Sequence, residues 1–381
     1  MSVSRVVVRL AVLSLVWGCD SGRDVLLGDL AANDAAIGEE GSTPDAVWDG
    51  GGASPDARLP DVDSEGGPPS TCASGEGVPM ATRAFLTDAV GFGRLAAGGS
   101  MGCVYHVTNL ADVGAGSLRE GAERLEPLWI VFDVSGDIEL TTAIALGSNK
   151  TVDGRGAAIT VRNFGFILGS ASVNVVIEHV TFIGNLQGSD NDAIKIVDGA
   201  HIVWIDHCSL SNYGDGLIDI TRAATDVTVS WCLFSMHDYA MLIGRSADDV
   251  DDVNIRVTLH HNWWNQTGSY APRLRFGKAH VFNNLIDRWR SAASACTMGG
   301  EIYSEANIFI AKDDKAGLAT SAGSDTVRGR ASTIGDWLQN GAEALPWEAD
   351  LVFQPSTFYR YTAVRADATL QTAIMDGAGA R

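Results

Sequence analysis

The chain has 381 residues, of which 46% are apolar, so it can bury a sizeable core and is not disordered throughout. Its 43 glycines against 10 prolines are too many for a helical bundle and are typical of a chain that turns often. With 47 acidic and 27 basic residues the net charge is −20. That balance excludes a nucleic-acid partner, because phosphate binding needs clusters of Lys and Arg.

The N-terminus has the pattern of an export signal. Arg5 and Arg9 precede an apolar run, residues 10–17, that is too short to span a bilayer, and Cys19 closes the segment. We interpret residues 1–19 as a signal peptide of the lipoprotein type, with a lipid on Cys19 as the only membrane attachment. An ordinary secretory signal is the alternative. The protein is predicted to be secreted or held at the surface of a bacterial envelope.

An acidic linker is predicted to follow, over residues 20–72. The stretch 20–66 holds twelve Asp or Glu and two Arg, a charge of −10, which is half of the net charge of the chain. Such a segment cannot bury enough apolar surface to fold, so we expect a disordered tether before a folded domain at 73–381. Cys72 and Cys103 could form a disulfide at the edge of that domain, which export permits, although their spacing alone does not show it.

A repeat of about 22 to 30 residues organises the middle of the chain. One column of the repeat, spaced by 28, 24, 30, 22 and 23 residues, reads Val180, Cys208, Cys232, Asn262, Asn284 and Asn307. Two positions later stands an apolar column: Phe182, Leu210, Phe234, Trp264, Ile286 and Phe309. Short β-branched segments with turn residues between them at this period predict stacked coils, that is, an all-β parallel β-helix.

Further structural expectations follow from the repeat. Asn in one column suits an inward turn where stacked amides bond along the axis. Cys208 and Cys232 are predicted to be buried thiols on neighbouring coils rather than a disulfide. We also expect a short helix around residues 335–339, outside the stack, and a C-terminal tail from about residue 340 that packs back along the coils.

Several motifs carry a more specific signal. They are Gly91-Phe92-Gly93-Arg94, Asp192-Ala193-Ile194, Val203-Trp204-Ile205-Asp206-His207-Cys208-Ser209, Asp215-Gly216-Leu217-Ile218-Asp219, His260-His261-Asn262 and Pro272-Arg273-Leu274-Arg275-Phe276-Gly277. In these blocks and their order, residues 80–310 resemble polysaccharide lyase family 1, the pectate lyases, in their bacterial version. The resemblance implies a right-handed single-stranded β-helix and a calcium-dependent β-elimination that cleaves α-1,4-polygalacturonate in pectin degradation. An acidic polysaccharide is then the expected partner, Ca²⁺ the cofactor and a monomer the expected state.

The resemblance also implies a metal site. The calcium ligands of the family fall on Asp192, Asp215 and Asp219, with Asp190 as a fourth candidate. Calcium prefers hard oxygen ligands, and a cluster of carboxylates repels itself unless a cation lies among them. The alternative for each residue is an ordinary exposed aspartate in a turn.

Two cationic positions of the family carry tyrosines in this chain. Tyr270 stands where the resemblance places the base arginine, and Tyr239 where it places a substrate-binding lysine, whereas the substrate-binding arginine is kept as Arg275. Three interpretations stay open: Tyr270 is itself the base, its phenolate favoured by calcium and Arg275; Arg273 or Lys278 reaches in instead; or the protein binds uronate without efficient cleavage. The candidate catalytic residues are Tyr270, Arg273 and Arg275, and the candidate substrate-binding residues are Tyr239, Arg275 and Lys278.

Overall fold

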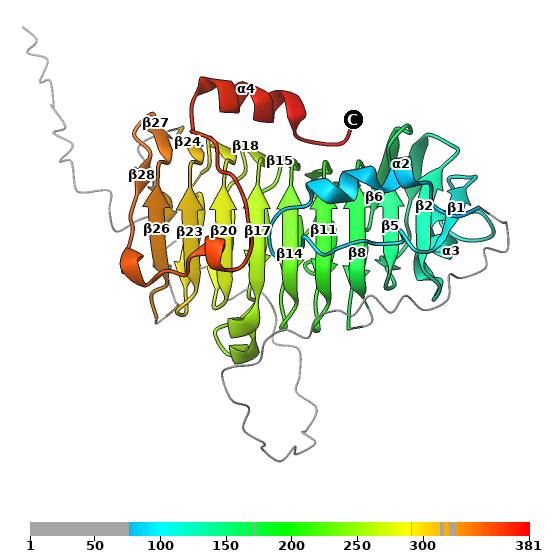
Figure 1. Ribbon diagram of the computed structural model, residues 1–381, viewed down its shortest axis with the longest axis horizontal. Coiled ribbons are helices and arrows are strands. Elements are labelled where there is room, and N and C mark those ends of the chain that lie inside the picture. The colour runs from blue at the N-terminus through cyan, green and yellow to red at the C-terminus, as the bar shows by residue number, and fades with distance from the viewer. Residues whose placement is uncertain (1–75, 171, 291, 313–315, 320–324, 326) are drawn as a thin grey trace, which may run out of the picture.

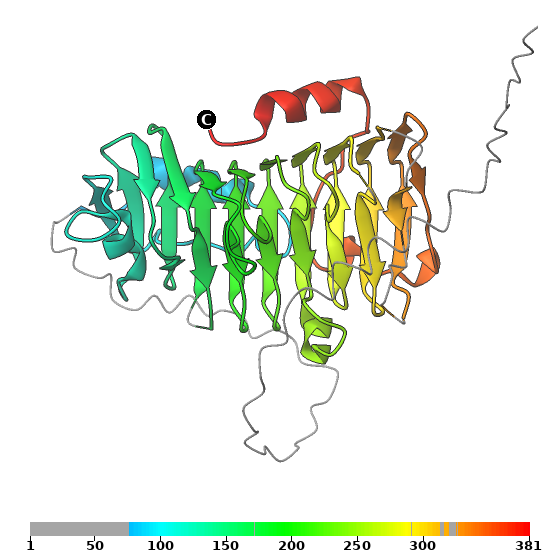
Figure 2. The ribbon, with the colours of Figure 1, turned by 180° about the vertical axis from the view of Figure 1, so that it is seen from behind.

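The chain winds into coils of three short strands, and the strands of successive coils pair in parallel to form three long sheets (Figure 1). The computed structural model describes residues 76–381, apart from 171, 291, 313–315, 320–324 and 326. The predicted signal peptide, the linker and Cys72 lie outside this part of the chain. The all-β parallel β-helix expected from the repeat is confirmed. Seen from behind, the stack keeps its order from end to end, with α4 (Ala368–Gly377) along one long edge (Figure 2).

The three sheets are named here by their order in each coil. Sheet 1 contains β1 (Cys103–Val107), β2 (Leu128–Phe132), β5 (Lys150–Asp153), β8 (Val173–Glu178), β11 (His201–Asp206), β14 (Thr225–Ser230), β17 (Arg256–His260), β20 (Lys278–Phe282), β23 (Glu301–Glu305) and β26 (Arg330–Ile334). Sheet 2 contains β3 (Gly136–Glu139), β6 (Ile159–Asn163), β9 (Thr181–Gly184), β12 (Ser209–Ser211), β15 (Leu233–Ser235), β18 (Trp263–Asn265), β21 (Leu285–Asp287), β24 (Ile308–Ile310) and β27 (Trp337–Gln339). Sheet 3 contains β4 (Ile144–Ala145), β7 (Phe166–Leu168), β10 (Ile194–Ile196), β13 (Ile218–Ile220), β16 (Met241–Ile243), β19 (Arg273–Arg275), β22 (Ser294–Thr297), β25 (Ala316–Ala319) and β28 (Glu343–Ala344).

Short helices lie outside the sheets. The helix α3 (Leu118–Glu123) buries Leu118 and Ala122 against the first coils. The others are α2 (Met80–Arg83) and the 3-10 helices η1 (Ala84–Asp88), η2 (Val250–Asn254), η3 (Ala349–Leu351) and η4 (Pro355–Thr357). The core fills the inside of the coils, where the predicted apolar column from Phe182 to Phe309 is at most 1% exposed.

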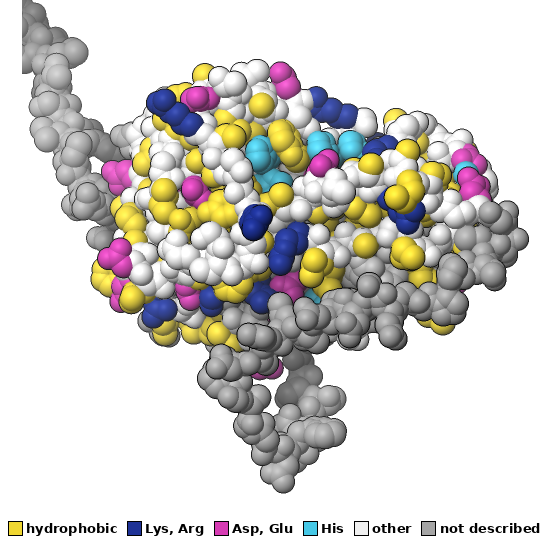
Figure 3. All heavy atoms as spheres, viewed as in Figure 1, with side chains coloured by type: hydrophobic (Ala, Val, Ile, Leu, Met, Phe, Trp, Pro, Cys, Tyr) yellow, Lys and Arg dark blue, Asp and Glu magenta, His cyan; other side chains and the backbone are white. Residues whose placement is uncertain are grey.

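The turn from sheet 1 to sheet 2 explains the polar column of the repeat. Its first residue has left-handed backbone angles in coil after coil, as at His207 (φ 47°) and Trp231 (φ 50°), so the second residue points inward. There Asn262 Nδ2 donates to Asn284 Oδ1 (3.0 Å), and Asn284 Nδ2 donates to Asn307 Oδ1 (2.9 Å), as the column predicted. The first residues stack outside as an aromatic ladder that includes His207 and Trp231, and histidines gather at this edge in Figure 3.

The cysteines agree with the sequence analysis where the structure describes them. Cys208 and Cys232 are buried and free on neighbouring coils, with the Cys208 N–H 3.4 Å from the Cys232 Sγ. The prediction of two core thiols is therefore confirmed. Cys103 is disulfide-bonded, and because Cys72 lies outside the described residues, their pairing stays a prediction.

The prediction of a short helix around residues 335–339 is wrong. The segment contains β27, whose Leu338 pairs in register with Phe309 of β24, so the stack continues through it. Gly335 takes the left-handed turn position (φ 68°), and the next residue, Asp336, accepts from the backbone N–H of Asn307 (2.8 Å). The Gly-Asp pair is thus one more sheet 1 to sheet 2 turn, with a carboxylate in place of the amide of the three preceding coils.

The C-terminal tail packs back along the stack, as expected. Tyr359 reaches sheet 1, where its hydroxyl oxygen lies 2.8 Å from the Thr258 hydroxyl. The helix α4 begins at the Asp367 cap and buries Leu370 and Ile374 with Leu285 on sheet 2. In the N-terminal segment, Phe85 of η1 packs on Trp204 of β11, so segments before and after the coils both contact sheet 1.

Three acidic side chains end neighbouring strands of sheet 1. Asp153, Glu178 and Asp206 are register partners at the ends of β5, β8 and β11. Glu178 is only 1% exposed, and burial, reinforced by the charge of Asp153, raises its pKa to about 9, although Arg155 3.4 Å away acts in the opposite direction. Glu178 therefore keeps its proton at neutral pH.

Replacing Glu178 by glutamine is expected to stabilise the fold increasingly as the pH rises from 4.5 to about 9. The unfolded chain ionises near the lower value while the folded chain holds its proton, so the parent loses up to about 1.4 kcal/mol of stability per pH unit across this window, and glutamine does not titrate. Thermal unfolding of both proteins over a pH series measures the difference, with the exposed Asp376→Asn as control. A difference that stays constant with pH would contradict a buried, protonated Glu178.

Candidate active site

Three of the predicted metal ligands converge at the outer side of sheet 3. Asp190 and Asp192 lie in the loop before β10, and Asp215 lies in the loop before β13, one coil later. One carboxylate oxygen from each lies within 4.8 Å of the other two. The stacking of coils brings these residues together, because the loops that precede successive strands of a parallel sheet lie side by side.

Asp219 joins this cluster from β13 itself. A Cβ atom at Gly216 would lie 2.5 Å from Asp219 Oδ1 and 2.8 Å from Asp192 Oδ1, so the two carboxylates close over a position that only glycine fits. The Gly216 N–H donates to Asp192 Oδ1 at 2.6 Å. The motif Asp215-Gly216-Leu217-Ile218-Asp219 thus supplies two carboxylates and, at Gly216, the space that lets Asp219 approach Asp192.

The carboxylates of the cluster outnumber the positive charge beside them. Burial, followed by the charge of Asp192, raises the pKa of Asp215 to about 7. The same two causes raise the pKa of Asp219 well above its ordinary value. Asp192 Oδ2 is buried and lies 3.2 Å from Lys195 Nζ, and burial raises the pKa of Asp192 also. All the donor atoms are oxygens, which hard cations such as calcium prefer. The buried carboxylates also raise one another's pKa values, so a divalent cation between them would favour their ionised forms.

Lys195 is a member of this cluster that the sequence analysis missed. It lies on β10, where it is the register partner of Asp219, and its side chain is 14% exposed. Its Nζ pairs with Asp190 and lies 3.2 Å from Asp192 Oδ2. The sequence did contain a signal for Lys195. Ile194 and Ile196 point into the core, and alternation along a strand turns the residue between them outward.

The two tyrosines form an apolar patch beside the carboxylates. The ring centres of Tyr239 and Tyr270 lie 4.9 Å apart, and both rings pack with Leu242 and Ala295. Leu242 of β16 is the register partner of Asp219 on one side and of Arg273 on the other. Since neighbouring strands are about 4.8 Å apart, the backbones of Asp219 and Arg273 are separated by about 10 Å.

The two predicted arginines point from β19 toward one carboxylate. Arg273 Nη1 donates to the Tyr270 hydroxyl oxygen (2.6 Å), while its Nη2 lies 3.0 Å from Asp325. Arg275 pairs with Asp325 at 3.2 Å and donates to the backbone oxygen of Arg245 (2.7 Å). Burial opposes ionisation of Asp325, but a hydrogen bond from Thr297 and the two arginines outweigh it and lower its pKa. Asp325 was not predicted, because it lies where the repeat is no longer visible in the sequence.

Lys278 is not brought to this site. It is the first residue of β20 in sheet 1, around the turn that follows β19, and its Nζ pairs with Glu301 at 3.3 Å. The structure therefore gathers the aspartates, the tyrosines and the two arginines on sheet 3 and its loops but leaves Lys278 on another sheet.

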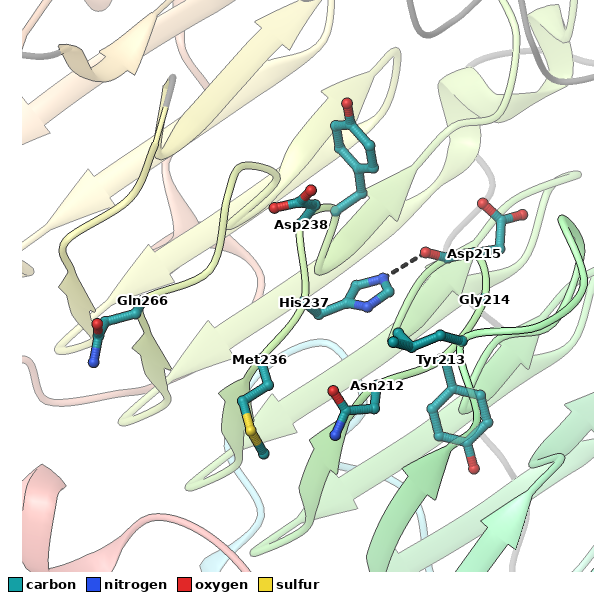
Figure 4. A pocket seen from close by; sticks show the side chains of 10 residues that line it. Asn212, Tyr213, Gly214, Asp215, Met236, His237, Asp238 and Gln266 are labelled. Atoms are coloured by element: carbon teal, nitrogen blue, oxygen red, sulfur yellow. Dashed lines mark hydrogen bonds between the residues drawn. The ribbon is translucent and has the colours of Figure 1, made fainter.

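A cavity of about 500 Å³ opens beside the carboxylates, between the loops that follow β12 and β15 (Figure 4). Asp215, Tyr239 and His237 line it, with the exposed Met236 on its wall. The His237 Nε2 lies 2.5 Å from the backbone oxygen of Asp215, and burial lowers the pKa of this imidazole. The sequence analysis did not select His237, which holds the Asp215 loop in place.

The fold and the site define a parallel β-helix protein with a carboxylate cluster and two arginines on one sheet. A family model described as pectate lyase matches residues 133–381. Among curated relatives, putative pectate lyase 2 of Arabidopsis thaliana is 37% identical over 291 residues, which are 69% of this chain and 75% of the relative. Pectate lyase 5 of Ambrosia artemisiifolia is 34% identical over 301 residues, which are 72% of this chain and 76% of the relative.

Solved structures agree. The cedar pollen allergen jun a 1 superposes with a TM-score of 0.71 at 28% identity, covering 82% of this chain and 99% of the allergen. A pectate lyase from Bacillus sp. N165, solved with trigalacturonate, has a TM-score of 0.61 at 21% identity over 76% of this chain and 98% of its own, a likeness of fold alone. The chain belongs to the pectate lyase family. The bacterial version expected from the motifs is not supported, because the curated relatives are plant proteins.

Proposed function

We propose that this protein is a calcium-dependent lyase that cleaves α-1,4-linked polygalacturonate. The observation that carries the proposal is the convergence of Asp190, Asp192 and Asp215, with ligand oxygens within 4.8 Å, on the same sheet as two arginines. Carboxylates are the ligands calcium prefers, and guanidinium groups suit a uronate carboxylate.

Each group has a distinct part in this proposal. Asp190, Asp192, Asp215 and Asp219 would hold the metal, which supplies Lewis-acid chemistry by withdrawing electron density from a uronate carboxylate and acidifying the C5 proton. Arg275 orients the substrate carboxylate. Removal of the C5 proton forms the C4–C5 double bond as the C4–O bond breaks, and the departing oxygen takes up a proton.

The geometry favours Tyr270 as the group that takes the C5 proton. Its oxygen accepts a hydrogen bond from Arg273, and a guanidinium donor stabilises negative charge on a phenolic oxygen. Arg273 is fully buried and bound to Asp325, and Lys278 belongs to another sheet, so both are worse placed to reach a sugar. Arg273 acts in this proposal as the positioning residue of Tyr270.

A uronate-binding protein without efficient cleavage is the second candidate. Two observations favour it: Tyr239 and Tyr270 form an apolar patch beside the carboxylates, and Asp325 already engages both arginines. A substrate carboxylate must compete with Asp325 for Arg275. Aromatic rings in the groove would then serve as stacking surfaces for sugar rings.

One assay separates the two candidates. Purified protein mixed with polygalacturonate at alkaline pH is expected to produce the absorbance of unsaturated uronate with calcium and not with an excess of chelator. Binding of the polymer without any rise in absorbance, at high protein concentration, would support the binding protein instead. Asp219→Ala serves as the control for metal dependence.

The location of the protein is a further part of the proposal. Export, and a lipid on Cys19 as the anchor to a bacterial envelope, rest on the N-terminal sequence alone. Among the residues that the structure describes, no helix is long and apolar enough to cross a membrane. Labelling of cells with a lipid precursor, compared between the parent and Cys19→Ala, tests the anchor.

A further inference from the structure

A lysine ammonium stands among the carboxylates that the proposed function assigns to calcium. Lys195 Nζ pairs with Asp190 and lies 3.2 Å from Asp192 Oδ2, an oxygen that is buried. Both of these aspartates also belong to the group whose oxygens converge within 4.8 Å. The ammonium and a metal ion would therefore compete for the same two carboxylates.

The backbone of Lys195 cannot move out of the way. It is held in β10 by pairing with β7 on one side and β13 on the other, and Asp219 is its register partner. Only the four-carbon stem of the side chain is free to choose another rotamer, and Asp190, one of its two partners, is 90% exposed. The lysine can thus leave the cluster by a rotation of its side chain, with no change in the sheet.

Calcium and the ammonium cannot both keep these contacts. Two cations a few ångströms apart repel each other, and the repulsion is strongest where burial excludes water, as at Asp192, whose side chain is 0% exposed. We propose that Lys195 is a built-in counter-ion that calcium must displace from Asp190 and Asp192, and that the displaced ammonium then binds a uronate carboxylate in the groove. This inference rests on the proposed function, and it assigns to Lys195 a cationic contact with the substrate.

The consequence is a site with a lower calcium affinity than its carboxylates alone would give. Lys195→Met keeps the length of the side chain and removes the charge, so it is expected to bind calcium about tenfold more tightly in calorimetric titration without substrate. Lys195→Arg keeps the charge and should not show this gain. Lys278→Met, which removes a lysine paired with a single carboxylate on sheet 1, is the matched control and should match the parent.

The second half of the inference has its own measurement. At saturating calcium, Lys195→Met is expected to bind trigalacturonate about tenfold more weakly than the parent, whereas Lys195→Arg should bind it nearly as well. A calcium affinity in Lys195→Met equal to or weaker than that of the parent would overturn the counter-ion role, and unchanged trigalacturonate binding would overturn the substrate contact.

The outcomes are separable from those of the proposed function. Equal calcium affinities in the two proteins, together with calcium-dependent cleavage by the parent, would overturn the inference and leave the lyase standing. Tighter calcium binding by Lys195→Met without any unsaturated product from the parent would uphold the counter-ion and remove the lyase activity.

Discussion

Replacing Asp219 by asparagine is expected to weaken calcium binding by at least about a hundredfold. Loss of a group that merely supports a metal ligand costs about 10- to 100-fold in affinity, and Asp219 is placed to be a ligand itself. Its carboxylate closes over Gly216 beside that of Asp192, and asparagine keeps this shape while removing the charge. The same change should stabilise the metal-free protein, because it removes a carboxyl group whose pKa is raised by burial and by the neighbouring charge of Asp192.

Calorimetry with calcium, and thermal unfolding in chelator, measure these two opposite effects. The matched control is Asp238→Asn, which changes a half-exposed carboxylate of the same groove that pairs with Arg290. It should leave calcium affinity within about twofold of the parent. Unchanged affinity in Asp219→Asn would mean that the metal site lies elsewhere, and a loss of stability in chelator would mean that Asp219 is held by contacts rather than strained by charge.

The pH dependence of the metal-free protein follows from the same cluster. The pKa of Asp215 is raised from 3.8 to about 7, so the folded chain holds a proton that the unfolded chain has released. The stability contributed by that proton is present at acid pH and is lost as the pH rises toward 7. Bound calcium reverses this dependence of stability on pH, because it binds the ionised carboxylate. We therefore expect calcium affinity to increase from pH 5 to pH 8 and the stabilisation by calcium to increase with it.

The repeat predicted the fold because each coil repeats one physical task. Positions such as Asn284 recur since every coil must make the same turn and satisfy the same inward backbone groups. The failure at residues 335–339 shows the limit of that signal. Asp336 occupies the inward position that asparagine holds in the preceding coils. An acidic residue after a glycine is typical of an exposed turn, so the sequence did not indicate an inward position.

The candidate site was predictable only where its residues belong to motifs. Asp192, Asp215 and Asp219 could be paired from their places in successive coils. Asp325 could not, because it comes from a segment without the repeat and meets Arg273 and Arg275 across about 50 residues. Alternation along β10 predicts that Lys195 points outward. An outward-pointing lysine does not by itself indicate a site, and its role becomes visible only when β10 is known to lie beside the strand of Asp219.

Tyr270→Phe is expected to lower the rate of cleavage by roughly 10²- to 10⁴-fold with little change in polygalacturonate binding, since general base catalysis contributes about that much. Phenylalanine keeps the packing with Leu242 and Tyr239. It removes one acceptor of the buried Arg273, which should cost about 1–3 kcal/mol of stability, so thermal unfolding must accompany the kinetics. Tyr239→Phe is the matched control: it changes the other ring of the pair and should retain most of the rate.

A second substitution at the same position tests whether the base was replaced or lost. If the tyrosine is the base, Tyr270→Arg should not exceed the parent, because it places a third guanidinium beside Arg273 and Arg275 around the single carboxylate of Asp325. A gain of activity in Tyr270→Arg, or full activity in Tyr270→Phe, would contradict a tyrosine base. The first result would identify a groove that has lost its base, and the second would move the proton transfer to another group, with His237 beside Asp215 as the next residue to replace.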